Sequence, residues 1–369
     1  MKGCKGFTLT ELIVAVIIFI LTLLALFATY EVFYRTSKQQ IATAQTSEKL
    51  RPAIEQLERL ISDAGFGISK DYLDGDTSTT AYINEEDEPD EGENIEDNEE
   101  NPDESKNLAA IAISTDSNIE FETNNSDYNN PLQIHLKSII GEYPYSGNYV
   151  VYDNNMFNDE NNLLSALGLQ NERDFSTIVM DINKIIIGGL NNGLPDTGLL
   201  ENGNIIIVGK SNAQNIDDYY YFKTIKLSSR TNEERGDNKY NICNPKTYNL
   251  QIVRGQGVPQ PLIPCVAYFN ADFGCYDGRK VKWHRNICKK IKDLRAVKIG
   301  LIVQSGFINK EYLYSEGDTL KFPTLGKTET SSDSVEFTIQ VDNSNIRNDM
   351  RYYKWEIIER IIATPNVNF

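Results

Sequence analysis

The stretch "KGFTLTELIVAVIIFILTLLALFATYEVFYRTSK", residues 5–38, decides the fold because it contains an apolar run long enough to cross a membrane. From Phe7 to Tyr30 the only charged side chain is Glu11. At about 1.5 Å per residue, an α-helix over this run reaches roughly 36 Å, whereas a hydrocarbon core is about 30 Å thick. We therefore predict that residues 7–30 span a membrane.

The residues that flank this run predict its orientation. Lys2 and Lys5 precede it, and by the positive-inside rule they hold the N-terminus in the cytoplasm and send the chain after Tyr30 across the membrane. A secretory signal would have a shorter apolar region followed by a small-residue cleavage site. Here the glycine, Gly6, lies before the apolar run instead.

The helix is expected to continue well beyond the membrane, over residues 7–64 in total. Neither Gly nor Pro occurs from Phe7 to Arg51, so nothing local breaks the helix there. Pro52 should kink it, and Gly65 and Gly67 should end it. Its second half carries one apolar stripe, of the kind that packs a helix on a globular domain, spaced by four and three residues: Leu50, Ile54, Leu57, Ile61 and Ala64.

The start of the chain resembles the type IV prepilin family. "KGFTLTE" matches a short basic leader that ends in glycine and is followed by phenylalanine and, five residues into the mature chain, a glutamate. The resemblance implies that residues 1–6 are a leader, that a prepilin peptidase cuts between Gly6 and Phe7, and that the new amino group of Phe7 is methylated. It also implies that Glu11 meets this ammonium on a neighbouring subunit. Thr10 departs from the more common aliphatic residue.

Later segments are similar to PilW-type minor pilins and to the related J-type pseudopilins of type II secretion. "LRPAIEQLERLISDAGFGI" (50–68) resembles the end of their helix. Residues 261–283, 294–306 and 352–366 resemble C-terminal segments of the PilW type, whereas roughly 69–255 match nothing familiar. The resemblance implies a minor pilin rather than a pseudopilin.

The sequence after residue 64 predicts a β-rich head. Together with the long N-terminal helix, this head makes the expected fold class α+β and pilin-like. Short runs rich in β-formers alternate with Asn, Asp, Gly and Ser clusters, as in half-buried antiparallel strands. We expect one domain over 65–369, with room for a small sub-lobe and a short helix at 160–170. The expected strands lie in 108–114, 118–123, 132–138, 148–153, 204–209, 219–227, 248–253, 296–304, 335–341 and 352–363.

The net charge of −17 has a local origin. Thirteen acidic residues and no basic ones lie between Glu85 and Glu104. Segment 84–105 has almost no apolar residue, so we predict a mobile loop there. The Asp-x-Asp-x-Asp-Gly spacing of a calcium loop is absent, and we expect no metal and no cofactor. We see no basic patch in the sequence and expect no nucleic acid to bind.

The cysteines predict disulfide bonds. Cys4 belongs to the leader, and an even number of cysteines remains for the oxidising side of the membrane: Cys243, Cys265, Cys275 and Cys288. Three pairings are open, and we favour Cys265 with Cys275 and Cys243 with Cys288. A zinc site with His284 is disfavoured because no Cys-x-x-Cys pair is present.

The sequence predicts a non-catalytic protein. His135 lies in a strand-like run, and no Ser-His-Asp set or phosphate loop accompanies it. By resemblance, the expected function is to prime assembly of a type IV pilus at or near its tip, with roles in adhesion, twitching motility or DNA uptake. The implied location is the inner membrane, then the pilus or cell surface. The implied partners are major and minor pilins, the prepilin peptidase, the inner-membrane assembly platform and a tip adhesin.

Two other functions stay open from the sequence. One is a J-type pseudopilin that caps a short periplasmic pseudopilus. The other is a permanently membrane-anchored extracytoplasmic binding module, which predicts no cleavage after Gly6.

Overall fold

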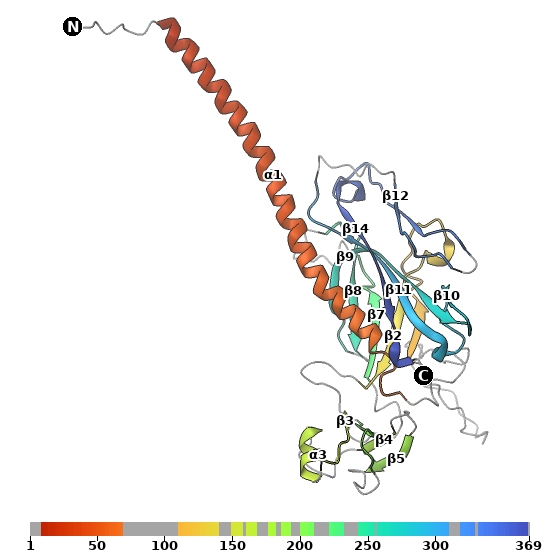
Figure 1. Ribbon diagram of the computed structural model, residues 1–369. Coiled ribbons are helices and arrows are strands. Elements are labelled where there is room, and N and C mark those ends of the chain that lie inside the picture. Colours follow the sequence, from red (N-terminus) through yellow and green to blue (C-terminus); the bar gives the residue numbers. More distant parts are fainter. Residues whose placement is uncertain are drawn as a thin grey trace, which may run out of the picture.

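A computed structural model gives the architecture. It describes residues 9–68, 110–139, 149–157, 160–167, 176–181, 186–192, 200–209, 221–231, 243–254, 257–309, 318–328 and 331–367. These residues form one long helix and a head built mostly from antiparallel strands (Figure 1). The predicted α+β class with a pilin-like N-terminal helix is confirmed.

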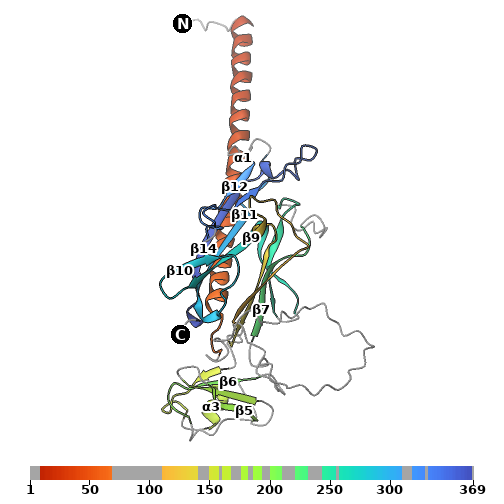
Figure 2. The ribbon, with the colours of Figure 1, turned by 90° about the vertical axis from the view of Figure 1, so that its right-hand side faces the viewer.

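The helix α1 (Leu9–Ser62) is continuous over 54 residues and covers most of the predicted helix. Pro52 lies inside it, so the backbone hydrogen bond that is lost at proline does not end the helix. The first half of α1 projects from the head as a free rod, and the second half lies along the head (Figures 1 and 2).

The main sheet has eight strands in the order β1-β2-β7-β8-β9-β11-β14, with β10 paired to β9, and all of these pairs are antiparallel. Its strands are β1 (Ile111–Thr115), β2 (Leu132–Ser138), β7 (Tyr221–Leu227), β8 (Tyr248–Arg254), β9 (Gln260–Tyr276), β10 (Val281–His284), β11 (Leu294–Gln304) and β14 (Trp355–Ala363). A separate two-stranded sheet pairs β12 (Thr319–Lys321) with β13 (Glu336–Thr338). Short 3-10 helices are η2 (Ser126–Tyr128), η6 (Ile291–Asp293), η7 (Met350–Tyr352) and η8 (Pro365–Val367).

Adjacent residues of β14 show which layers cover the two faces of the main sheet. The Glu359 carboxylate accepts hydrogen bonds from the backbone N–H groups of Thr324 and Leu325, at 3.0 and 2.7 Å. The next residue, Arg360, pairs instead with Glu58 of α1, at 3.4 Å from Nε to Oε1. Because successive strand residues point to opposite faces, α1 covers one face and the segment between β12 and β13 covers the other.

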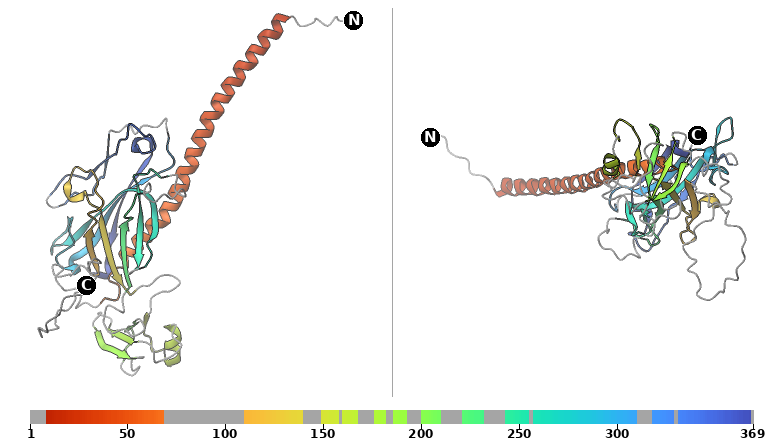
Figure 3. Two further views of the ribbon diagram at one scale, coloured as in Figure 1. Left: turned by 180° about the vertical axis from the view of Figure 1, so that it is seen from behind. Right: turned by 90° about the horizontal axis from the view of Figure 1, so that it is seen from below.

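A small four-stranded sheet forms a sub-lobe beyond the end of α1 (Figures 1–3). Its strand order is β3-β6-β4-β5. One face carries Ile178 and Met180 into the main core, whereas Val179 belongs to a second apolar cluster with the short helix. Its elements are β3 (Tyr149–Val151), α3 (Glu160–Ala166), β4 (Ser176–Met180), β5 (Ile186–Asn192) and β6 (Ile205–Val208).

The end of α1 is fixed by hydrogen bonds to two distant parts of the head. Gly65 N–H donates to the carbonyl of Lys137 in β2 at 2.8 Å. On the other side, the side-chain amide of Asn366 in η8, which follows β14, donates to the carbonyl of Ser62, also at 2.8 Å. Since β2 and β14 stand near opposite ends of the strand order, this corner joins both. As predicted, Gly65 and Gly67 end the helix, with φ of 79° and 75°.

All but one of the predicted runs contain a strand, and α3 lies in the predicted helical run. The exception is 118–123, where Ile119 and Phe121 are buried without a strand ladder. The chain turns at once into η2, where the Asn125 side chain accepts a hydrogen bond from Asp127 N–H at 3.1 Å. Within the run 118–123, strand-like pairing is limited to an isolated β-bridge between Thr123 and Phe337.

Strand β9 is a further departure from the sequence-based expectation, which assigned no strand to its 17 residues. From Val266 to Gly274 every residue is buried, because β9 is a central strand covered on both faces. A strand of this kind shows no alternation of polar and apolar residues. Pro261 and Pro264, near its start, further hide the pattern.

Candidate functional site

The first half of α1 exposes a continuous apolar surface. Within it, Leu12–Lys38 is long and apolar enough to cross a membrane, and its most apolar stretch of 18 residues has a mean hydropathy of 3.1. This span extends the predicted one, 7–30, beyond Tyr30. Nothing within the described part of the chain covers these side chains; Leu24 is 61% exposed and Phe27 is 68% exposed. This half can bury its surface only against lipid or other helices.

Polar side chains in this half are adapted to an apolar environment. The hydroxyls of Thr22, Thr29 and Thr36 each donate to the carbonyl four residues earlier, so none needs water as a partner. At the end of the span the rings of Tyr30 and Tyr34 stack at 6.1 Å between centroids. The Lys38 ammonium lies 4.5 Å from the centroid of the second ring. Tyr and Lys at this position are typical of a membrane–water interface.

The second half of α1 is packed on the head, as the stripe predicts. All five stripe residues are buried, and the side chains of Leu57 and Ile61 are fully covered. The helix contacts β14 and β9. On the rim, Arg51 and Glu55 form an exposed ion pair one turn apart at 3.1 Å. Burial of apolar area is therefore the main term that holds the helix to the head.

The two disulfides confirm that all four cysteines pair, but the favoured pairing is wrong. The bonds join Cys243 to Cys265 and Cys275 to Cys288, with Cα–Cα distances of 5.2 and 5.5 Å. Cys265 and Cys275 cannot pair, because they lie ten residues apart in the single extended strand β9. Ten strand residues span about 33 Å, whereas a disulfide needs Cα atoms within about 7 Å.

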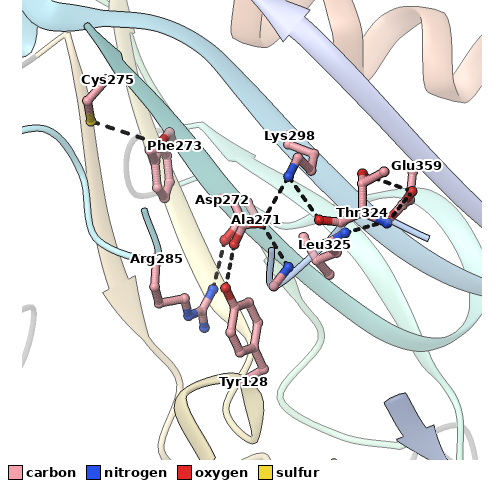
Figure 4. A network of polar contacts seen from close by, with 11 residues as sticks. Tyr128, Ala271, Asp272, Phe273, Cys275, Arg285, Lys298, Thr324, Leu325 and Glu359 are labelled. Carbon is pink, nitrogen blue, oxygen red and sulfur yellow. Dashed lines mark hydrogen bonds and ion pairs between the residues drawn. The ribbon is translucent and has the colours of Figure 1, made fainter. Parts of the chain in front are cut away.

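A buried polar network holds the end of the sheet that the Cys275–Cys288 bond closes (Figure 4). At its centre the Asp272 carboxylate accepts a hydrogen bond from the Tyr128 hydroxyl at 2.6 Å and from Gly326 N–H at 3.0 Å. The Lys298 ammonium lies 3.5 Å from Oδ2 of Asp272, the oxygen that also accepts from Gly326, and it donates to the Thr324 carbonyl at 3.0 Å. Burial lowers the pKa of Lys298, and Asp272 opposes that shift. Burial and then Asp272 raise the pKa of the Tyr128 hydroxyl.

Arg285 forms a second part of this frame. Its guanidinium donates to the backbone carbonyls of Asp127, Ala271 and Asn130, at 2.8, 3.0 and 3.2 Å. It also lies 4.6 Å over the ring centroid of Tyr128. The side chain therefore joins the loop around η2 to β9. Burial lowers its pKa, but a guanidinium stays charged in proteins.

The expectation that the chain has no basic patch is wrong. Residues 277–295 contain eight Lys and Arg and two Asp. The expectation rested on the whole-chain charge, which hides this local excess. Arg279, Lys280, Lys289 and Lys290 are exposed at this end of the sheet. Of these four, Lys289 lines a hollow of about 630 Å³, together with Tyr128, Tyr276, His284, Arg285 and two acidic residues, Asp127 and Asp293.

Of the other predicted site residues, some lie in the part of the chain that the structure describes and some lie outside it. Gly6 and Phe7 lie outside the described residues, as does segment 84–105. Glu11 is in the first turns of α1, but its side chain lies outside the described part. His135 lies in β2, where its Nε2 and Nδ1 are 2.9 and 3.0 Å from the hydroxyls of Ser114 and Thr224. The buried network around Asp272 was missed, although an Asp inside the apolar run "VAYFNADFG" could have signalled it.

Comparison with known proteins identifies the N-terminal segment. Residues 1–27 match the family model of the prokaryotic N-terminal methylation motif. The match indicates a type IV prepilin-like protein, a class processed by prepilin peptidase and associated with pilins. It covers the predicted leader and the start of α1, and it does not reach the head. No curated protein and no solved structure matches the chain.

Proposed function

We propose that the chain is a minor pilin of the PilW type that helps to prime assembly of a type IV pilus. The observation that carries the proposal is the continuity of α1. A methylation motif leads directly into a helix whose first half is exposed and apolar and whose second half is packed on the head. Cleavage of the leader would therefore release a helix that is ready to pack among others.

The chemistry of assembly rests on two charges that are costly alone. Cleavage after Gly6 creates an ammonium at Phe7, and methylation keeps its charge. A charged side chain at the centre of a membrane helix costs about 2.5–3.5 kcal/mol on insertion scales, and Glu11, near the start of the span, costs less because it can reach the interface. Pairing Glu11 with the Phe7 ammonium of a neighbouring subunit offsets that cost and sets the register between helices.

The size of the head supports a minor pilin at or near the tip. The chain has a mass of 41.8 kDa, with an eight-stranded sheet packed beside the second half of α1 and a four-stranded sub-lobe beyond the end of the helix (Figure 2). A shaft of closely packed helices leaves little room for such a head on every subunit. At the tip, no subunit lies above the head.

The disulfides support an extracytoplasmic head. Both bonds lie in the described part of the head, and disulfides persist on the oxidising side of a membrane. In this location the helix would contact the inner-membrane assembly platform. The head would contact major and minor pilins or a tip adhesin. We assign it no catalytic role.

Mass spectrometry of the N-terminal peptide tests the proposal. We expect methylated Phe7 as the first residue in a sheared surface fraction. Gly6→Leu is a matched control, because it alters only the cleavage site and should leave the terminus at Met1. If the unaltered chain keeps Met1 and occurs only in membranes, the pilin proposal fails and a permanently anchored binding module is favoured. If the processed chain instead supports protein secretion and no pili, it is a J-type pseudopilin.

A further inference from the structure

An amine and a carboxyl group lie side by side in the interior of the head. Lys298 in β11 and Asp272 in β9 are directly opposite each other in the antiparallel register. Their side chains are only 3% and 0% exposed. Removing an ammonium and a carboxylate from water is costly, and their attraction repays this cost only when the geometry is excellent. The pair therefore needs an account of why both groups are kept in the core.

The geometry of this pair is not that of a strong ion pair. Nζ of Lys298 lies 3.5 Å from Oδ2 of Asp272, whereas charge-assisted hydrogen bonds are about 2.7–2.9 Å long. Nζ makes a shorter contact with a neutral group, the carbonyl of Thr324, at 3.0 Å. The centroid of the Trp283 ring is 4.3 Å from Nζ. The ammonium is therefore surrounded as much by neutral groups as by its carboxylate.

The environment of Lys298 favours its nucleophilic form. Burial lowers the pKa of the ammonium, and Asp272 opposes this shift. A lysine side chain is a nucleophile only as the neutral amine, and removal from water increases the population of that form. The amine that results lies against the Asp272 carboxyl group.

The carboxyl group of Asp272 is polarised by two donors. The Tyr128 hydroxyl donates to Oδ1 at 2.6 Å, and Gly326 N–H donates to Oδ2 at 3.0 Å. Donors aimed at these oxygens stabilise the negative charge that develops when a nucleophile attacks the carboxyl carbon. Burial, followed by the charge of Asp272, raises the pKa of the Tyr128 hydroxyl, so this group keeps its proton and remains a donor.

The surroundings exclude bulk water but leave a route out of the site. The segment between β12 and β13 covers the pair through the Thr324 carbonyl and Gly326 N–H. In Figure 4 the side chains of Lys298 and Tyr128 both point toward Asp272. Tyr128 and Gly326 also line the hollow of about 630 Å³. A water molecule formed at Asp272 could leave through this hollow, and the covered site would slow the reverse hydrolysis.

We propose that Lys298 and Asp272 condense to an intramolecular amide that joins β11 to β9. A proton passes from the ammonium to the carboxylate, which leaves a neutral amine and a neutral carboxylic acid. Nζ then attacks Cγ, the N–C bond forms and one C–O bond breaks. The leaving oxygen departs as water, with one hydrogen from the acid and one from the amine. No atom changes its oxidation state, so the step needs no co-reactant.

The amide would lock two central strands of the main sheet. Lys298 and Asp272 are 26 residues apart, and the Cys275–Cys288 disulfide closes a smaller loop within the same segment. A disulfide opens under reducing conditions, whereas an amide does not. The amide would therefore keep β9 joined to β11 when the disulfide is lost. The inference concerns the head alone and goes beyond the proposed pilin function, so it can fail while N-terminal processing holds.

Mass spectrometry of the full chain, purified in a nonionic detergent and then reduced, tests the proposal. We expect a mass that is lower by one water molecule than the mass of the same processed sequence. Trypsin should then release a branched peptide made of residues 255–279 and 296–310, without cleavage after Lys298. A full mass, with the two peptides separate and cleavage after Lys298, would overturn the proposal.

Two substitutions test the chemistry of the bond. Asp272→Asn supplies a side-chain amide whose leaving group is ammonia instead of water. Its condensed product should therefore have the same mass as the condensed unaltered chain. Lys298→Arg should give separate peptides, because a guanidinium stays protonated in proteins. Loss of water from the Lys298→Arg variant would assign the link to other residues and contradict the proposal.

The exposed pair of Lys282 and Asp277 is an internal control in the same digest. Its charged atoms are closer, at 3.1 Å, but the side chains are 29% and 34% exposed. We expect normal cleavage after Lys282, because water surrounds this pair and burial does not favour its neutral forms. A link at Lys282 would show that proximity alone is sufficient, and it would overturn the argument from burial.

Tyr128→Phe tests the donor while it keeps the ring. The fraction of branched peptide, measured at set times after synthesis, should show condensation that is slower by at least about tenfold. Tyr353→Phe is the matched control, because the Tyr353 ring is also buried but its hydroxyl donates to the Arg347 carbonyl. Its rate should be unchanged. Equal rates for the Tyr128→Phe variant and the unaltered chain, with both folded in thermal unfolding, would refute the role of the hydroxyl.

Discussion

The two halves of α1 differ in apolar content and in environment: the first half is apolar all round and exposed, whereas the second half carries one apolar stripe that is buried. Leu24, in the first half, is 61% exposed, and Leu57, in the second, is fully buried. Both belong to one unbroken helix, so the helix itself does not decide which side chains are covered. The second half packs on a sheet of the same chain, whereas the first half presents its apolar surface outward. The second half, which is already packed within the chain, should govern the stability of the head. The first half, whose apolar surface is exposed, should govern assembly with other subunits.

The largest effect is expected from Glu11→Ala in the first half. Loss of the carboxylate removes the predicted pair with a neighbouring Phe7 ammonium, so the protein should disappear from sheared filaments. Insertion into the membrane should persist, because a charge has been removed from an apolar segment. Immunoblots of sheared and membrane fractions measure both. Glu31→Ala, near the other end of the span, is the control, and normal incorporation of the Glu11 variant would show that the pairing is unnecessary.

Leu57→Ala tests the second half and should destabilise the head by about 2–5 kcal/mol, because it leaves a cavity under a fully buried side chain. The matched change Leu24→Ala should alter stability by less than about 0.5 kcal/mol, because that side chain packs against nothing in the described chain. Urea unfolding of the full chain in detergent gives both values. Equal losses would mean that the two halves do not differ in the way proposed.

Gly67→Ala probes the corner where the second half ends. Its φ is 75°, and an added Cβ would lie 2.4 Å from Ile139 Cδ1. We expect a loss of about 2–4 kcal/mol, from backbone strain together with overpacking. Gly278→Ala isolates the strain, because its φ is 90° but no atom lies within 4 Å of the added Cβ. It should cost about 1–2 kcal/mol. Thermal unfolding of both variants separates the two terms.

Asp63→Asn, one residue after α1, should have the smallest effect. Burial raises the pKa of Asp63 above its usual 3.8, against the opposing charges of Lys223 and Arg59. A raised pKa contributes stability below pH 3.8, and that stability is lost as the pH rises through the folded-state pKa. The variant should therefore gain up to about 0.5 kcal/mol over the unaltered chain at neutral pH. Unfolding at pH 3 and pH 7 measures the difference, and a larger gain at pH 3 would contradict the assignment.

The sequence predicted the parts of the fold that leave a periodic trace. The stripe from Leu50 to Ala64 has helical spacing, and β2 alternates apolar and polar residues along its length. Strand β9 escaped prediction because both of its faces are covered, which removes the alternation. The disulfide pairing then failed for the same reason, since an unseen strand kept Cys265 and Cys275 apart.

The candidate sites likewise divide into one that the sequence displays as a linear motif and one that only the fold brings together. Gly6, Phe7 and Glu11 belong to a linear motif, which sequence alone can display. The network around Asp272 joins residues from η2, β9, β11 and the segment before β13, and no spacing along the chain encodes it. The basic segment 277–295 was readable from the sequence, but the acidic residues between Glu85 and Glu104 dominated the overall charge and concealed it.

The corner at the end of α1 also determines how the molecule carries mechanical load. A pull along α1 reaches β2 through the Gly65–Lys137 bond and reaches the end of β14 through the Asn366–Ser62 bond. The tension is therefore divided between two strands near opposite ends of the strand order. To detach the helix, a pulling force would have to break both attachments and shear the apolar stripe from the sheet at the same time.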